Sequence, residues 1–178
     1  MLIPSHALLW SALLSVCACS PTYNWREMRP AGTPLLALMP CKPEAATRPV
    51  PLTGTPTELH MHSCDTGGLR FAVAWADVGA PDRVPLALTA WQVASLQSLR
   101  VSALAADVEA RRWTVVVAGV PAAQGLRAQG VDPEGQPVQT RAAYFARGSV
   151  IYQAAVYGAT LPDETVETFF AGLRLGAP

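Results

Sequence analysis

A strand with one bulky face and one small face limits the fold of this chain more than any other feature. Along Leu69–Val78 large side chains alternate with alanines, and successive side chains of a strand point to opposite faces of a sheet. The large residues are Phe71, Val73 and Trp75, and the small ones are Ala72, Ala74 and Ala76. The run Asp65-Thr66-Gly67-Gly68 predicts a turn that pairs this strand with Thr57–Cys64 in a hairpin. We expect a helix to pack closely against the alanine face.

The C-terminal half predicts further antiparallel strands. Leu126–Val131 and Val138–Ala146 form a second predicted hairpin across the turn Asp132-Pro133-Glu134-Gly135. Ser149–Tyr157 follows as another strand after the turn Arg147-Gly148.

Three shorter extended stretches precede the first hairpin. They are Tyr23–Met28, Pro34–Met39 and Glu44–Leu52. Pro49 and Pro51 interrupt the last of them. Because proline cannot donate a hydrogen bond to a ladder, we expect this stretch at the edge of a sheet.

Two stretches predict helices. Pro85–Ala106 begins with a proline, which suits a first helical position, and its apolar residues recur at helical spacings. Pro162–Leu173 carries acidic residues in its early turns, where they complement the helix dipole. Arg111–Val120 is either a strand or a buried connection. This order of elements predicts an α+β fold, with a mostly antiparallel sheet of about six strands and two helices packed on it.

The N-terminus is typical of a bacterial export signal. Ala7–Ala18 is uncharged and too short to span a bilayer, and it suits a signal peptide at residues 1–18. Val16-Cys17-Ala18-Cys19 resembles the lipobox of bacterial lipoproteins, which implies acylation at Cys19. Ser20 after that cysteine implies an outer-membrane protein that faces the periplasm. Because Lys and Arg are missing before the apolar run, a plain secretory signal and a buried N-terminal helix remain alternatives.

The composition places the remaining chain among globular proteins. Of 178 residues, 51% are hydrophobic, and 13 basic side chains balance 13 acidic ones. A disordered chain would be less hydrophobic and more highly charged. Without a basic stripe we expect no nucleic-acid partner. The length suits one domain, at residues 23–176, after a lipidated tether at 19–22.

Two cysteines remain in this domain, Cys41 and Cys64. In an oxidising compartment two such cysteines pair more often than they stay free. A bridge between them would stabilise the fold by about 3.4 kcal/mol in the chain-entropy model. We therefore predict a disulfide.

The C-terminal third carries the pattern of a known fold family. Thr140–Gly158 gives two strands around a tight turn, and the final helix ends in Phe169-Phe170-Ala171-Gly172-Leu173. With Trp25, Pro34 and Met39-Pro40 near the start, these residues resemble the PsbP/Mog1-like fold, found in uncharacterised proteobacterial lipoproteins. The resemblance implies a binding or assembly factor and brings no catalytic motif.

One cluster of metal-ligand side chains is present. Glu58, His60, His62 and Cys64 would share one face of a strand, and Cys41 could supply a further ligand for zinc or copper. The predicted disulfide would remove both sulfur ligands, so metal binding through His60 and His62 is only an alternative.

Other signs of chemistry are weak. Nucleophile, phosphate-loop and dinucleotide motifs are missing from the sequence, so we assign no catalytic residue and no cofactor. Arg141 and Arg147 flank Tyr144-Phe145 and could bind an anionic ligand, but exposed hairpin arginines are the simpler interpretation.

The favoured function is a non-enzymatic binding or assembly module of the bacterial cell envelope, held in the membrane by its lipid and bound to an envelope protein of unknown identity. A metal-binding protein and a small envelope hydrolase with an unrecognised site are the alternatives.

Overall fold

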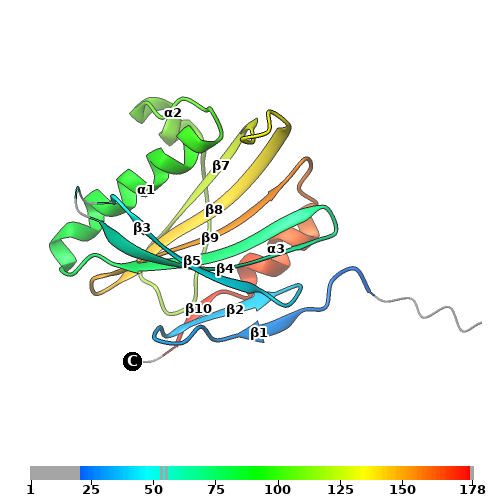
Figure 1. Ribbon diagram of the computed structural model, residues 1–178, viewed down its shortest axis with the longest axis horizontal. Coiled ribbons are helices and arrows are strands. Elements are labelled where there is room, and N and C mark those ends of the chain that lie inside the picture. The colour runs from blue at the N-terminus through cyan, green and yellow to red at the C-terminus, as the bar shows by residue number, and fades with distance from the viewer. Residues whose placement is uncertain (1–20, 53, 55, 177–178) are drawn as a thin grey trace, which may run out of the picture.

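The computed structural model describes residues 21–52, 54 and 56–176, which form two sheets and three α-helices (Figure 1). The strands are β1 (Arg26–Met28), β2 (Leu35–Met39), β3 (Glu44–Val50), β4 (Thr57–Thr66), β5 (Leu69–Asp77), β6 (Arg112–Trp113), β7 (Ala123–Val131), β8 (Pro137–Arg147), β9 (Val150–Gly158) and β10 (Arg174–Leu175). The helices are α1 (Val84–Ser98), α2 (Ala105–Ala110) and α3 (Asp163–Ala171), with a short 3-10 turn, η1 (Pro81–Arg83). The α+β class and the antiparallel pairing are confirmed. The expected single sheet of about six strands with two helices is wrong, because these residues contain ten strands in two sheets and a third helix, α2.

Two meanders build the large sheet, whose strand order is β3-β4-β5-β9-β8-β7-β6. After β5 the chain passes through η1, α1 and α2 to the far edge at β6, and β7, β8 and β9 lead back to the centre beside β5. Both predicted hairpins are confirmed. Gly67 and Gly68 both have positive φ, as the tight turn between β4 and β5 requires. The stretch with Pro49 forms the exposed edge strand β3, as expected.

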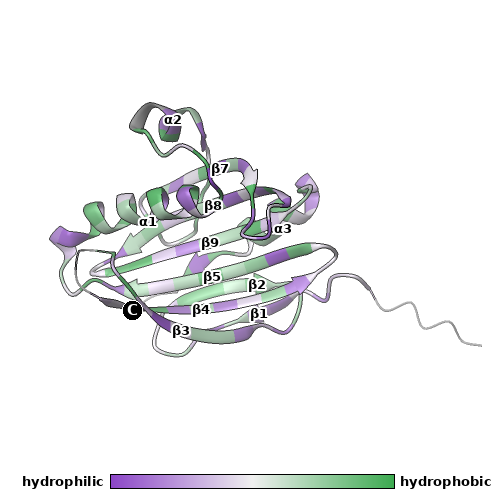
Figure 2. Cartoon of the chain, turned by 45° about the horizontal axis from the view of Figure 1, so that its top comes forward, coloured by the Kyte–Doolittle hydropathy of each residue, from purple (hydrophilic) through white to green (hydrophobic). Residues whose placement is uncertain are grey.

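The two faces of the large sheet carry different layers. The bulky face of β5 packs against the small sheet and α3, and the other face packs against α1. The first layer buries Phe71, Val73, Phe145, Tyr152, Phe169 and Leu173, and the second buries Ala76, Ala87, Trp91, Leu96, Tyr144 and Ile151. Figure 2 shows hydrophobic residues (green) along the central strands and along α1, which lies on one side of the sheet.

The small sheet joins the two ends of the described chain. Its order is β1-β2-β10, so β2 lies between the first strand and the last. Leu36 of β2 pairs with Arg174 of β10. The Arg147 guanidinium secures this end of the chain, because it donates to the backbone carbonyls of Gly119 and Gly176.

The predicted helix Pro85–Ala106 is shorter in the structure. α1 ends at Ser98, because Arg100 adopts a left-handed conformation with φ 56°. The backbone N–H of Val101 donates to the Leu96 carbonyl at 3.0 Å, and that of Arg100 donates to the Gln97 carbonyl at 2.9 Å. These two bonds define a Schellman motif, in which the left-handed position is usually glycine.

Two other sequence expectations change. Only Arg112–Trp113 of the stretch 111–120 forms a strand, β6, and the rest connects it to β7 without regular structure. Within this connection Val117 is buried and Val116 is exposed. The predicted signal peptide and Cys19 lie outside the described residues. Among the helices of residues 21–176 that are described, none has the length and hydrophobicity to cross a membrane.

Candidate functional site: the groove between α1 and the sheet

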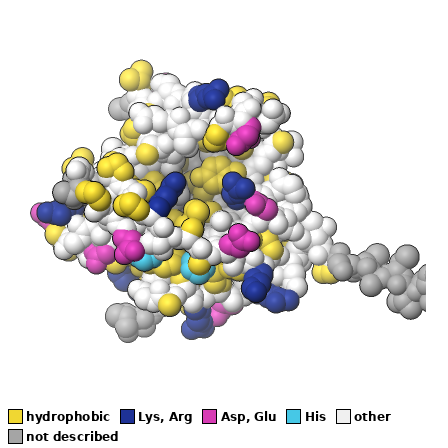
Figure 3. Space-filling view, in the orientation of Figure 1, with side chains coloured by type: hydrophobic (Ala, Val, Ile, Leu, Met, Phe, Trp, Pro, Cys, Tyr) yellow, Lys and Arg dark blue, Asp and Glu magenta, His cyan; other side chains and the backbone are white. Residues whose placement is uncertain are grey.

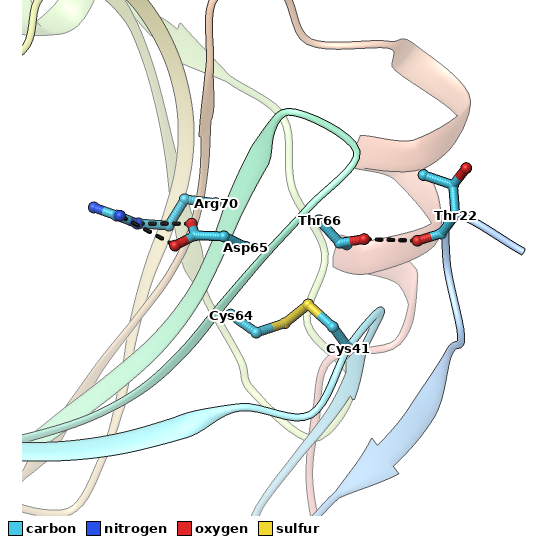
Figure 4. The surroundings of a disulfide bond; sticks show 6 residues. All are labelled: Thr22, Cys41, Cys64, Asp65, Thr66 and Arg70. Atoms are coloured by element: carbon cyan, nitrogen blue, oxygen red, sulfur yellow. Dashed lines mark hydrogen bonds and ion pairs between the residues drawn. A yellow bond between two sulfur atoms is a disulfide. The ribbon is translucent and has the colours of Figure 1, made fainter. Parts of the chain in front are cut away.

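The predicted disulfide is present between Cys41 and Cys64 (Figure 4). Their Cα atoms are 6.0 Å apart, within the usual range for a bridged pair. Cys41 follows β2 of the small sheet and Cys64 belongs to β4 of the large one, so the bridge ties the two sheets together. Both cysteines are also among the residues that line a groove.

This groove has a volume of about 700 Å³ and opens between α1 and strands β3, β4 and β5. α1 contacts β8 and β9, so the helix covers only part of the small face of the sheet. Figure 3 shows hydrophobic side chains (yellow) in a hollow on this face, with charged side chains around it. The apolar lining includes Leu52, Leu59, Met61, Ala72, Ala74 and Trp91.

The alanine face predicted from the sequence therefore serves two purposes. Ala76 belongs to the core that packs against α1, in agreement with the expected helix contact. Ala72 lines the groove instead, and Ala74 belongs both to the core and to the lining. Small side chains at these positions leave room for a ligand beside the helix.

A buried glutamine marks the place where α1 meets the groove. The Gln153 side-chain nitrogen donates to Ser95 Oγ of α1 at 3.0 Å and to the Tyr144 hydroxyl oxygen at 2.9 Å. Burial raises the pKa of Tyr144 far above its usual value, so its hydroxyl is neutral at physiological pH. These bonds fix the Gln153 side chain in the wall of the groove, which also contains Ser98 and Tyr157.

Charged side chains form the outer part of the groove. Asp65 and Arg70 are bound to each other through two hydrogen bonds, of 2.9 and 3.1 Å (Figure 4). Glu44, Lys42 and Arg48 also line the groove, and none of the three forms an ion pair with another described residue. After the Asp65–Arg70 pair is set aside, two cations and one anion remain.

The two histidines of the predicted metal site lie on the other face of β4. Both rings stack on the indole of Trp75, with centroid distances of 5.3 Å for His60 and 5.5 Å for His62. Thr47 Oγ1 lies 3.2 Å from His60 Nδ1, and a Glu58 carboxylate oxygen lies 3.8 Å from His60 Nε2. Burial, with a smaller contribution from His60, lowers the pKa of His62.

Glu58, His60, His62 and Cys64 share one face of β4, as strand alternation predicts, but not all four are available as ligands. Cys64 is bonded to Cys41, which removes both sulfur atoms from any metal site. In the part of the chain that the structure describes, three or more His, Cys, Asp or Glu side chains do not gather in a way that could hold a metal ion.

Several residues of the groove were not identified from the sequence. No role was predicted for Lys42, Arg48 or Gln153. A signal was available for Arg48, because β3 alternates so that Glu44 and Arg48 share the face of Leu59 and Met61. For Gln153 the only signal was a polar residue in a strand of apolar ones.

Comparisons with protein-family models, with curated proteins and with solved structures found no match for this chain. The interpretation of the groove therefore depends on its own geometry and chemistry. Its lining combines apolar side chains, a fixed glutamine and charged side chains.

Proposed function

We propose that the protein is a non-enzymatic binding module of the bacterial cell envelope and that its binding site is the groove between α1 and strands β3, β4 and β5. The observation that carries this proposal is the groove itself, about 700 Å³ in volume with Trp91 of α1 and Ala72 and Ala74 of β5 in its wall. A concave pocket of this size, lined by apolar side chains together with polar and charged ones, is a usual form of a binding site.

The proposed occupant is a segment of a partner protein with apolar side chains and an acidic flank. The apolar wall would bury the side chains of such a segment. Lys42 and Arg48 form no ion pair with other described residues, so their charges remain available to carboxylates of the partner. The Ser95 hydroxyl and the Gln153 side-chain nitrogen already donate within the protein, so the Gln153 side-chain oxygen is the group left to accept a hydrogen bond where the segment passes α1.

Binding fits this site better than catalysis does. His60 and His62 lie on the opposite face of β4 and stack on Trp75. Of the two carboxylates that line the groove, Asp65 is held by Arg70. We also propose the PsbP/Mog1-like fold, because the antiparallel sheet with a C-terminal helix that buries Phe169 is the arrangement that the sequence resemblance implies.

The envelope location rests on the N-terminal sequence, and we propose acylation at Cys19. The test is the intact mass of the protein from a bacterial membrane fraction. We expect a chain that begins at Cys19 and carries added acyl mass. An unlipidated chain that retains residues 1–18 would contradict this part of the proposal without affecting the groove.

The groove is tested with the anionic apolar dye anilinonaphthalene sulfonate and with two peptides. One peptide contains leucine, valine and glutamate, and in the other lysine replaces glutamate. We expect the dye to bind with increased fluorescence and the acidic peptide, but not the basic one, to displace it. Ala94→Trp should block dye binding because Ala94 lines the groove. Gln97→Trp is the matched control, since Gln97 is exposed on α1 and outside the groove lining.

The charged rim is tested separately with Arg48→Glu. We expect this variant to weaken the acidic peptide and to strengthen the basic one. Dye binding that is unaffected by Ala94→Trp, or equal displacement by both peptides, would contradict the proposed site and occupant.

A further inference from the structure

A second pocket, of about 360 Å³, lies where β7 and β8 approach α2 and the segment before α3. It is independent of the groove, and its lining differs in character. Arg111, Arg127 and Arg141 line it together with Gln129, Gln139 and Thr140. The arginines and glutamines can donate hydrogen bonds, whereas the buried Thr140 hydroxyl already donates to the Val156 carbonyl, and no carboxylate is among the lining residues.

The sheet register brings two of the arginines together. Arg127 of β7 lies directly opposite Arg141 of β8, and Gln129 lies opposite Gln139 next to them. Like charges at directly opposite positions destabilise an antiparallel pair. Of the two, only Arg141 has a carboxylate partner among the described residues. Its guanidinium donates to Asp163 at 2.7 Å, and Asp163 is not among the residues that line the pocket.

The third arginine has an unsatisfied donor. Arg111 Nε is buried and has no hydrogen-bond partner among the described residues. Neither Arg111 nor Arg127 forms a side-chain hydrogen bond or ion pair with any of them. A buried donor without an acceptor costs free energy, so a cluster of this kind is explained by a ligand that supplies acceptors.

We infer that this pocket is a binding site for a phosphate-type anion, either free phosphate or the headgroup of an anionic phospholipid. Three guanidinium groups against one carboxylate leave a charge that matches a dianion. Guanidinium forks bind the paired oxygens of phosphate in a bidentate manner, and a tetrahedral anion has enough oxygens for several forks. Gln129 and Gln139 would supply neutral donors beside them.

The test is a titration of the folded domain with inorganic phosphate, followed by calorimetry and by the melting temperature. We expect wild-type protein to bind phosphate and to melt at a higher temperature in its presence. Arg127→Gln should weaken phosphate binding about tenfold or more, since a charge-assisted hydrogen bond is lost. Arg111→Gln should act in the same direction. Arg83→Gln is the control, because Arg83 is exposed in η1 and far from the pocket lining.

The melting temperature without phosphate separates a ligand site from a structural role. Arg127→Gln should not lower it, because the substitution removes repulsion from Arg141. A variant that loses stability and phosphate binding together would contradict the inference, as would phosphate binding that is unchanged in both arginine variants. Equal affinity for succinate would overturn the assignment to a phosphate-type anion.

Vesicles distinguish the two sources of phosphate. Phosphatidylcholine vesicles with and without phosphatidic acid are mixed with the protein and sedimented. If the protein binds inorganic phosphate, and free phosphate also displaces the protein from vesicles, the same arginines bind both free phosphate and the headgroup. Vesicle binding that needs phosphatidic acid and Arg127, without measurable binding of inorganic phosphate, assigns the site to a headgroup. Failure in both arms overturns the inference and leaves the groove proposal unaffected.

Discussion

Arg127 and Arg141 lie directly opposite each other on β7 and β8, and among residues 21–176 that the structure describes only the Asp163 carboxylate is bound to the pair. Reversing one charge should convert repulsion into attraction. We expect Arg127→Glu to stabilise the protein without added phosphate by about 0.2–1 kcal/mol, the usual range for a cross-strand pair. Urea denaturation measures the change, with Arg83→Glu as the control. A destabilised Arg127→Glu protein would show that the two guanidinium groups do not repel each other.

The disulfide between Cys41 and Cys64 predicts a large effect of reduction. We expect the doubly substituted protein, Cys41→Ser with Cys64→Ser, to lose about 3.4 kcal/mol of unfolding free energy, because the open loop gains entropy in the unfolded chain. Denaturation curves with and without reductant measure this loss. Reductant should destabilise wild type and leave the double variant unchanged. Equal curves for wild type under both conditions would contradict a structural role for the bridge.

The end of α1 offers a test of backbone strain. Arg100 holds a left-handed conformation that glycine adopts without steric cost. Arg100→Gly should therefore stabilise the protein by about 0.5–1 kcal/mol. Ser98→Gly, two residues earlier in the last turn of the helix, should instead destabilise it by about 1 kcal/mol. Thermal denaturation of the two variants checks the opposite signs, and a loss of stability in both would mean that the Arg100 side chain contributes more than its backbone strain costs.

The lowered pKa of His62 predicts that the free energy of unfolding decreases in acid. Burial, with a smaller effect of His60, lowers its pKa below the usual 6.5, so the unfolded chain takes up the proton before the folded protein does. The contribution of His62 is thus fully present above about pH 6.5 and is lost as the pH falls through the lowered pKa of the folded state. Melting temperatures across this range should fall less for His62→Gln than for wild type. Parallel curves would contradict the assignment.

Local signals in the sequence predicted much of the fold. Turns with Gly67-Gly68 and Asp132-Pro133 place glycine or proline where the backbone needs it, so both hairpins were found. α1 was overextended because its Schellman motif uses Arg100 and lacks the glycine that normally marks a helix end. The second sheet was missed, since the pairing of β2 with β10 joins residues from opposite ends of the chain and leaves no local pattern.

The candidate sites also differ in whether a local signal in the sequence predicts them. The disulfide followed from counting cysteines, and the shared face of His60 and His62 followed from strand alternation. The groove depends on where α1 crosses the sheet, which the sequence does not encode locally. The arginine pocket depends on the strand register that places Arg127 opposite Arg141. It also depends on the backbone hydrogen bond from the Arg127 N–H to the Arg111 carbonyl, which brings Arg111 beside them.

The position of β2 between β1 and β10 has a consequence for biosynthesis. The ribosome delivers β10 only after all the other strands, so during synthesis β2 has one neighbour and the core beneath it is incomplete. Non-local pairings of this kind form late and slowly. A nascent chain therefore cannot close its small sheet, or bury Leu175, until residues 174–175 have been synthesised.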